Sequence, residues 1–475
     1  MKSGERFTPP YPVPPANKRS LLSRLWKGWG SWIHVVFTKS YTLKLGKVSM
    51  PNIDMFVVGE HKLVEKVLEK DNDQFPKHRY LAELLDPLIG ESLFSVNGDQ
   101  WKEQRTMLIG AFGHAHLKRA FGKMDSAARD VIEHIRSDSV SASRRGLHMD
   151  TYTTHVTADV IYRFILSKEL GRDDSQVIFT AFHNYQKHAQ RSFILKLYKL
   201  PYGYFARQAE KEAVKIRGIF RPYVESRYRA YQALDETAKA SYEEKDMLDS
   251  IIRAVHPQTG RVFSSEEIID QIAFIFLAGH ETSASALTWT LYLLAKSPDL
   301  QERLYEEVQK VTEGGELAFE HIRKLEKTGN VFKEVLRLYP PVSFFMREAA
   351  CPMTMRDKQV DEGSLVVVSP WLIQRSTNHW QNPHEFDPER FNKDNEQAQQ
   401  RCPVHGDSLN QGFFPYGKGA RICMGAAFAH QEAVIILAHI LNNFKLVYTD
   451  SKEPEAISRV TTRPKHGVYV SAVER

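Results

Sequence analysis

Apolar residues recur at helical spacing through most of the chain. The pattern predicts helices over residues 100–112, 114–137 and 151–165. A long apolar segment over 264–296 begins with Ser-Ser-Glu-Glu, which is typical of a helix N-terminus, so we expect one long buried helix there. A further predicted helix over 331–338 ends before two consecutive prolines, because proline cannot continue the hydrogen-bond ladder of a helix.

Segments with the pattern of β-strands are short. They are 48–58, 353–360, 365–369 and 444–448. A polar stretch over 391–412, rich in Asn and Gln, predicts a loop, and a last helix is expected after residue 425. Because no long linker separates the helical part from the strands, we expect a proline-rich arm over 1–20 and one domain over 21–475. Its predicted fold class is mainly α with small β-sheets, an α+β fold.

Composition and charge indicate in which compartment the protein works and which kinds of partner it binds. The chain has 475 residues and only three cysteines, which favours a reducing compartment, and we expect a cytoplasmic protein. Its net charge is +6, and most of the surplus lies in the first 30 residues. The rest of the chain is close to balance, so no nucleic-acid partner is expected. No apolar run is long enough to span a bilayer.

Three tryptophans near the N-terminus suggest two different roles. Residues 21–37 predict a helix in which Trp26, Trp29 and Trp32 recur every three residues among basic side chains. Such a helix could form a peripheral contact with a membrane. Alternatively, the three indoles pack beneath the domain.

The segment PYGKGARICMG is built so that backbone, rather than side chains, surrounds its single cysteine. Gly417, Gly419 and Gly425 allow close approach to a flat cofactor. Arg421 suits an anionic group on that cofactor, and the helix after Gly425 directs its N-terminal amides towards Cys423. These features favour a metal-binding thiolate. The alternative is a buried free cysteine after a glycine-rich turn.

YGKGARICMG resembles the haem-binding loop of the cytochrome P-450 family. The resemblance implies that Cys423 is the metal ligand and that Tyr416, Gly417, Arg421 and Gly425 bind the cofactor. The family usually has phenylalanine where this chain has Tyr416. A tyrosine ring can pack there equally well, but its hydroxyl needs a hydrogen-bond partner or access to water.

The helix that precedes the two prolines carries a second match. Glu334 and Arg337 are three residues apart, share one helix face and resemble the family's ExxR motif. The segment FDPERF resembles the family's meander, which implies that Arg390 joins them in a buried cluster that supports the cofactor loop. The alternative is an ion pair at the surface, which contributes little to stability.

The long apolar helix contains AGHET, which is similar to the family's oxygen-activation motif. Ala278 and Gly279 would leave room for the cofactor and a diatomic ligand, while Glu281 and Thr282 would supply an acid and a hydroxyl for proton delivery. The alternative is a glycine required for helix packing, beside a threonine that bonds its own helix.

Arginines at three places match residues that hold the cofactor's propionates in the family. WKEQR resembles the WxxxR motif and places Trp101 and Arg105 on one helix face. Arg347 follows the two prolines at a position where the family commonly has a propionate arginine. With Arg421, these residues offer three guanidinium groups to two carboxylates.

Taken together, the resemblance implies haem b between the long central helix and the C-terminal cysteine loop, as in the soluble bacterial members. The implied reaction inserts one oxygen atom of O2 into a C–H bond of a lipophilic substrate such as a fatty acid, terpenoid or steroid-like molecule. The expected pocket includes residues 75–95 and 342–346. Electrons would come from a separate ferredoxin, with its reductase, or from a flavodoxin-type donor, docking near Arg401 and Lys418.

Two other functions remain open. One is a peroxide-dependent fatty-acid hydroxylase or decarboxylase, although such relatives commonly lack the Glu281–Thr282 pair. The other is a non-enzymatic haem protein that senses a gas or carries electrons. Cys402 and His405 resemble half of a zinc site, but no second half accompanies them, and a polar loop is favoured.

Overall fold

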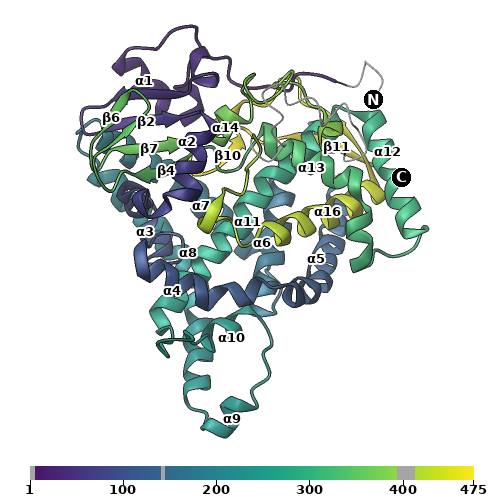
Figure 1. Ribbon diagram of the computed structural model, residues 1–475. Helices are drawn as coiled ribbons and strands as arrows, with labels where there is room; N and C mark the ends of the chain where they lie inside the picture. The colour runs from purple at the N-terminus through teal and green to yellow at the C-terminus, as the bar shows by residue number, and fades with distance from the viewer. Residues whose placement is uncertain (1–5, 141–144, 393–411) are drawn as a thin grey trace.

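A long helix, α11 (Ser265–Ala295), forms the centre of the protein. The computed structural model describes residues 6–140, 145–392 and 412–475. α11 starts with the predicted cap: the Ser264 hydroxyl accepts from the Glu267 amide, and the Glu267 carboxylate accepts from the Ser264 amide. It packs against α6, α8, α13 and α16, and these helices surround it in Figure 1.

The fold is mainly helical, as the sequence predicts. The other described α-helices are α1 (Leu21–Gly28), α2 (His61–Glu65), α3 (Arg79–Ile89), α4 (Gly98–Leu108), α5 (His114–Val140), α6 (Met149–Leu166), α7 (Arg172–Leu197), α8 (Gly203–Gln232), α9 (Glu236–Ala240), α10 (Met247–Ile252), α12 (Pro298–Thr312), α13 (Glu326–Leu338), α14 (Pro370–Ile373) and α16 (Ala426–Asn443). The helices predicted over 100–112, 114–137, 151–165 and 331–338 are confirmed, with ends that differ by at most five residues. No helix in this described part combines the length and apolar character needed to cross a bilayer.

The strands form small separate sheets at the edges of the helical body. The largest has the order β1-β2-β7-β4, with β2 and β7 parallel and the other pairs antiparallel. The others have the orders β3-β11-β8, β10-β9 and β5-β6. The strands are β1 (Leu45–Ser49), β2 (Asp54–Val58), β3 (Leu147–His148), β4 (Phe345–Glu348), β5 (Met353–Met355), β6 (Lys358–Val360), β7 (Leu365–Val368), β8 (Phe444–Tyr448), β9 (Ala456–Ser458), β10 (Thr462–Pro464) and β11 (Tyr469–Glu474).

The helix predicted over 21–37 is shorter than expected. α1 stops at Gly28, and a single 3₁₀ turn (Trp32–His34) follows. Two glycines, Gly28 and Gly30, break the helix because glycine disfavours helical continuation. The bend turns Trp32 inwards, where its ring meets Phe193 edge to face at 5.1 Å.

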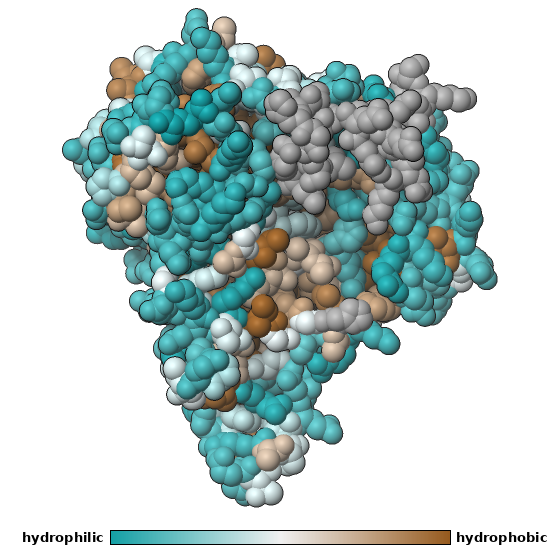
Figure 2. Space-filling model, in the orientation of Figure 1, coloured by the Kyte–Doolittle hydropathy of each residue, from teal (hydrophilic) through white to brown (hydrophobic). Residues whose placement is uncertain are grey.

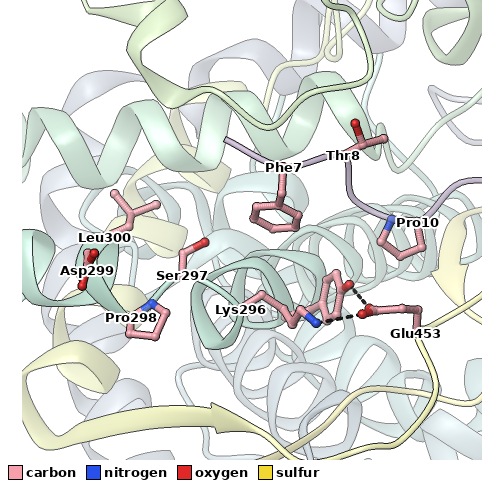
Figure 3. Close-up of a pocket in the computed structure, with 10 residues that line it drawn as sticks. Phe7, Thr8, Pro10, Lys296, Ser297, Pro298, Asp299, Leu300 and Glu453 are labelled. Atoms are coloured by element: carbon pink, nitrogen blue, oxygen red, sulfur yellow. Dashed lines mark hydrogen bonds and ion pairs between the residues drawn. The ribbon is translucent and has the colours of Figure 1, made fainter. Parts of the chain in front are cut away.

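The described part of the proline-rich arm lies along the helical body. Phe7 forms an isolated β-bridge with Phe386, and the Tyr339 hydroxyl donates to the Pro10 carbonyl at 2.6 Å. Between the arm and the end of α11 is a surface pocket of about 460 Å³, in which Glu453 bonds Lys296 and Tyr292 (Figure 3). None of the predicted site residues lines this pocket. The predicted loop over 391–412, with Arg401, Cys402 and His405, lies almost entirely outside the described residues.

Glu334, Arg337 and Arg390 lie together in the core. Arg337 donates from Nε and Nη2 to both Glu334 carboxylate oxygens at 2.7 Å, and Arg390 Nε lies 3.4 Å from Glu334 Oε1. The Arg337 guanidinium also donates to the main-chain carbonyls of Gln374, Pro383 and Glu385. One buried ion-pair cluster therefore fixes a long irregular segment of the chain.

Gln374 extends this cluster to the cysteine loop. Its side-chain nitrogen donates to the carbonyls of Leu336 and Arg337, and its side-chain oxygen accepts from the Phe414 amide at 3.1 Å. The end of α13 and the start of the cysteine loop are therefore held by the same amide group.

Replacing Glu334 by glutamine leaves two buried guanidinium groups without their carboxylate. We expect the free energy of unfolding to fall by about 3–5 kcal/mol, measured by urea denaturation. Asp99→Asn is the matched control, because the Asp99 side chain is 92% exposed and pairs with Lys102 at the surface. Its loss should be within about 1 kcal/mol. Equal losses for the two variants would contradict a structural role for the Glu334 cluster.

Candidate haem-thiolate site

The segment that carries Cys423 is a tight loop between two fixed points. The Cys423 amide donates to the Tyr416 carbonyl at 2.9 Å, and Gly425 is the N-cap of α16. Gly419 has φ +67°, and a Cβ there would lie 2.2 Å from the Leu68 carbonyl oxygen. Only glycine fits at position 419, so the loop packs directly on the backbone of the helical segment that contains Leu68.

The Cys423 side chain is open on one side. The residue is exposed although the loop surrounds it closely, and a Cβ at Gly425 would be 3.9 Å from the Cys423 sulfur. Burial raises the pKa of the Cys423 thiol, while the Gly425 amide and the Arg105 guanidinium act in the opposite direction. Burial outweighs both, so the pKa stays above its usual value, and a bound metal ion would be what favours the thiolate.

Arg421 lies inside the protein without a carboxylate partner. Its guanidinium donates to the Val96 carbonyl and to the Asn97 side chain, at 3.1 and 2.9 Å. It also stacks over the Trp101 ring, 4.4 Å from the ring centre. The structure thus brings together the predicted residues Trp101 and Arg421, which are far apart in the sequence.

Arg105 and Arg347 complete the predicted set of arginines. Arg105, on α4, donates to the Ile422 carbonyl at 3.2 Å, next to Cys423. Arg347, on β4, is 6% exposed, and its guanidinium donates to the Met346 carbonyl at 3.3 Å. Both guanidinium groups contact neutral acceptors instead of acids.

These arginines lie near one another, and Lys77 joins them. Burial and the neighbouring charges of Arg347 and Arg105 lower the pKa of Arg421 to about 9. Burial lowers the pKa of Arg347 to about 10. Burial, together with all three arginines, lowers the pKa of Lys77 well below its usual value. None of the four forms an ion pair with a described residue, so the cluster lacks an anion.

Lys77 was not predicted from the sequence as part of the site. It lies in the segment 75–95, which was predicted only as a pocket wall. Its amide donates to Asn97, its ammonium lies 3.3 Å from the Phe94 ring centre, and it forms a β-bridge with Arg347. The sequence contains no local signal for this role, because the bridge joins segments that are distant in the chain.

The AGHET segment of α11 is divided between two environments. Ala278 is exposed and Thr282 half-buried, and the Thr282 hydroxyl donates to the Ala278 carbonyl at 2.7 Å. Gly279 instead packs on α6, where a Cβ would lie 2.8 Å from the Ile161 side chain. Gly279 is therefore required for helix packing, which was the alternative interpretation of this segment. Ala278 and Thr282 lie on the open face of α11.

Glu281 is buried in an ion pair that the sequence did not predict. Arg463 donates to both of its carboxylate oxygens at 2.6 Å, and Thr461 and Gln186 also donate to it. Burial alone would raise the pKa of Glu281, but the pairing with Arg463 outweighs burial and lowers it. The carboxylate is fixed between α7, α11 and the β9–β10 turn, without a hydrogen bond to Thr282.

Glu432 is a second buried acid, on α16. It is fully buried, and burial raises its pKa to about 8, so the group is protonated at neutral pH. Ser283, the neighbour of Thr282, lies close enough to act in the opposite direction on this pKa, but neither carboxyl oxygen has a hydrogen-bond partner among the described residues. Glu432 is the only acidic residue of α16, a helix that is mostly apolar, and this pattern could have singled it out from the sequence.

The Tyr416 hydroxyl is the one departure from the family's haem-binding loop. Among the residues that the structure describes, it has no hydrogen-bond partner. Burial raises the pKa of Tyr416, and the nearby Cys423 and Glu432 raise it further. The hydroxyl is therefore held neutral close to the sulfur and the buried acid.

These residues fit a flat, anionic metal cofactor. An open cysteine sulfur suits the metal, four cations without acid partners suit carboxylates on the cofactor, and small or hydroxyl residues lie on the open face of α11. In the described residues, no group of three or more His, Cys, Asp or Glu side chains could hold a metal ion by itself. A haem bound through a cysteine thiolate meets all of these requirements.

The chain belongs to the cytochrome P450 family, whose model matches residues 25–470. The chain is 28% identical over 410 residues to the taurochenodeoxycholic 6 alpha-hydroxylase of Sus scrofa, covering 83% of this chain and 78% of the relative. It is 26% identical over 468 residues to the probable cytochrome P450 9f2 of Drosophila melanogaster, covering 93% and 88%. It is also 28% identical over 410 residues to cytochrome P450 4A10 of Mus musculus, covering 83% and 77%.

Membership defines the chemistry at a coarse level. The protein is a haem-binding monooxygenase, an oxidoreductase that uses O2, a lipophilic substrate and a redox partner. The helical fold with small separate sheets is that of the family. The identity of the substrate and of the electron donor are finer points, addressed below as proposals.

Cys423→Ser should abolish the red-shifted Soret band of the reduced carbon-monoxide complex, because that band requires a thiolate ligand. The measurement is a difference spectrum of the purified protein. Cys351→Ser is the matched control: Cys351 is also exposed, lies elsewhere in the fold, and should leave the band unchanged. Persistence of the band in Cys423→Ser would refute the ligand assignment.

Tyr416→Phe removes a buried hydroxyl that lacks a partner. We expect the free energy of unfolding to stay the same or rise by about 1 kcal/mol, because no hydrogen bond is lost. Tyr339→Phe is the control, since it loses the bond to Pro10 and should cost about 1 kcal/mol. Denaturation curves of both variants measure the difference. A larger loss for Tyr416→Phe would mean that its hydroxyl has a partner.

Proposed function

We propose that the protein binds haem b and hydroxylates a lipophilic small molecule of the fatty-acid, terpenoid or steroid-like class. Electrons would come from a separate ferredoxin, with its reductase, or from a flavodoxin-type protein, in the cytoplasm. One observation carries the proposal: the open Cys423 sulfur and the unpaired cations at Arg105, Arg347 and Arg421 surround the same site.

Each group at the site has a defined task in this proposal. Cys423 would ligate the iron, while Arg105, Arg347 and Arg421, with Lys77, would hold the two carboxylates. Haem supplies the activation of O2, and the thiolate donates electron density that favours O–O cleavage. The protein's part is to hold the cofactor, orient the substrate and deliver protons.

Thr282 would carry the proton at its Oγ1. Its hydroxyl lies on the half-buried face of α11 and donates to the Ala278 carbonyl, which leaves its oxygen free to accept a hydrogen bond from a water molecule through which a proton would be relayed. Glu281 takes part only when Arg463 releases its carboxylate, because the ion pair holds it away from Thr282. Until then, Glu281 fixes the β9–β10 turn against α11.

The substrate class is supported by the side chains near the open face. Half-buried apolar residues lie on the segment before α4, on α11 itself, on the segment after the two prolines and in the β9–β10 turn, and all of them pack against the main core. They are Phe94, Phe274, Leu277, Phe344 and Val460. A relative named as a taurochenodeoxycholic 6 alpha-hydroxylase supports a lipophilic substrate. Such surroundings would hold it by burial of apolar area.

A protein donor is supported by the outer face of the cysteine loop. Ile422, next to Cys423, is 45% exposed, and Ile109 on the neighbouring segment is 54% exposed. Figure 2 shows brown and tan atoms gathered on this face, over the start of α16. Lys418, predicted as part of a docking face, is ion-paired with Glu69 at 3.5 Å.

Turnover with a surrogate ferredoxin and reductase, compared with hydrogen peroxide alone, tests this proposal. A compound that shifts the spin state of the haem should be hydroxylated with the ferredoxin system and NADPH. Product formed with peroxide only would support the peroxide-dependent alternative instead, although Arg463 is already neutralised by Glu281 and is not free for a substrate carboxylate. Absence of product in both systems would favour a haem sensor.

Thr282→Ala should keep the haem but divert reducing equivalents to hydrogen peroxide, because the proton donor is lost. The ratio of product to NADPH consumed measures this coupling. Thr290→Ala is the matched control: Thr290 lies on the same helix and makes the same bond to the carbonyl four residues earlier, at 2.8 Å. Equal coupling in the two variants would reject the role of Thr282.

A further inference from the structure

The hairpin of β9 and β10 carries two arginines in different surroundings. Arg463, on β10, pairs with Glu281 and Asp150, which compensates its buried charge. Arg459, in the turn, is half-buried, but its guanidinium forms neither an ion pair nor a hydrogen bond with a described residue. Burial and the charge of Arg191 lower the pKa of Arg459. Of the two arginines, only Arg459 is therefore available to another anion.

Hydrogen bonds hold this turn against α7 and against the segment that follows α1. The Thr461 hydroxyl donates to the Gln186 side chain on α7 at 3.4 Å. At the other end of the turn, the Ser458 amide donates to the Ser31 hydroxyl at 2.8 Å. Figure 1 shows β10 next to α7. Arg459 therefore lies where three segments that are distant in the sequence meet.

Two basic residues of α7 lie near the turn. Lys187 and Arg191 are four residues apart, so they share one face of the helix. The Arg191 guanidinium carbon lies 5.2 Å from the Trp29 ring centre and 5.5 Å from that of Phe205, and its Nε is buried without a hydrogen-bond partner among the described residues. Neither Lys187 nor Arg191 pairs with an acid in the described part of the chain. α7 therefore adds two unpaired cations to the one in the turn.

His183 lies close to both groups of cations. Partial burial is the largest cause that lowers the pKa of His183, and the charge of Arg459 is the second. Lys187, one helical turn further along α7, acts in the same direction. The imidazole is therefore mainly neutral at pH 7 and can donate one hydrogen bond.

Acids are absent from the two stretches that supply these groups. No aspartate or glutamate occurs from residue 175 to residue 209 or from residue 456 to residue 473. Glu455, just before the second stretch, pairs with Lys465 at 2.8 Å. The cations of α7 and of the turn therefore surround a place to which these stretches contribute no anion.

We propose that these groups bind the carboxylate of an acidic, lipophilic substrate. We call them the basic site: His183, Lys187, Arg191 and Arg459. The proposal rests on the proposed hydroxylase function and narrows its substrate to a fatty acid or another lipophilic acid. Arg459 is the principal ligand, because a guanidinium binds a carboxylate through two parallel hydrogen bonds. Lys187 and Arg191 add charge, and His183 adds a hydrogen-bond donor.

The basic site continues into apolar surroundings. Val460, the residue after Arg459, packs against the main core. Thr461 donates to Glu281, which directly precedes Thr282 on α11. A turn of three residues therefore joins the basic site to the helix that carries the open face. A molecule with one acidic end and an apolar body matches both, since its carboxylate neutralises the cations and its body buries apolar area.

Titrations that follow the spin state of the haem test the proposal. The purified holoprotein is titrated with two matched pairs: dodecanoic acid and dodecan-1-ol, and lithocholic acid and its methyl ester. In a pair that binds, the acid should bind at least about tenfold more tightly than the neutral compound, because hydrogen bonds to charged groups are strong. Neutral compounds that bind as tightly as their acids, or acids that cause no shift, would overturn the proposal.

Inorganic phosphate distinguishes a substrate site from a site for any small anion. At the concentration of the acid, phosphate should compete only weakly, because it lacks an apolar body. Full competition by phosphate would overturn the proposal and assign the basic site to a free anion.

Substitutions at the turn locate the carboxylate. Arg459→Gln should remove most of the preference for the acid, with a much smaller effect on the neutral compound, and Arg459→Lys should retain part of the preference because it keeps the charge. Arg323→Gln is the matched control, at an exposed arginine of the 3₁₀ turn Phe319–Lys324, and should leave the preference unchanged. Equal weakening of acid and neutral compound by Arg459→Gln would mean that Arg459 only shapes the turn, which would overturn the proposal.

The carbon-monoxide difference spectrum of the same samples tests the proposed function separately. A normal thiolate band together with equal binding of acids and neutral compounds would reject the basic site and leave the haem-thiolate function intact. Loss of the band in the unchanged protein would reject the proposed function itself, and the basic site with it. A normal band in every Arg459 variant confirms that the variants are folded.

Discussion

Four buried or half-buried cations that form no ion pair with a described residue are the constraint on which the site depends. Arg105, Arg347, Arg421 and Lys77 lie near one another. Burial lowers the pKa of all four, and neighbouring cations lower the pKa of Arg421 and Lys77 further. Such a cluster is costly unless an anion binds in it. A cofactor with two carboxylates removes this cost, so its binding and the stability of the surrounding loop are linked.

The rest of the fold fixes the positions of that cluster and of Cys423 relative to each other. The buried pair of Glu334 and Arg337 fixes the end of α13. The Gln374 side chain accepts a hydrogen bond from the Phe414 amide and so fixes the start of the loop that carries Cys423. α11 supplies the opposite wall, and its polar residues divide into a face that packs and a face that stays open. Cys423, the cations and Thr282 therefore come from separate elements that one core keeps together.

Local patterns predicted much of this arrangement. The cap at Ser264, the stop after Leu338 and the short strands depend on neighbouring residues, so the sequence reveals them. The sequence did not reveal which distant side chains contact each other. The partner of Glu281 is Arg463, 182 residues later, and the neighbour of Gly279 is Ile161 on another helix. Spacing within one segment cannot disclose which distant side chain will fill the space, and for that reason the acid of AGHET was predicted only as a proton donor.

The central claim is that the protein inserts one atom of molecular oxygen into a lipophilic substrate. Its most direct test is turnover under ¹⁸O2 with a ferredoxin system, using a compound that shifts the haem spin state, with the product analysed by mass spectrometry. The account predicts one ¹⁸O atom in each hydroxylated product and none from labelled water. A product whose oxygen comes from water, or from added peroxide while O2 is left unused, would contradict it.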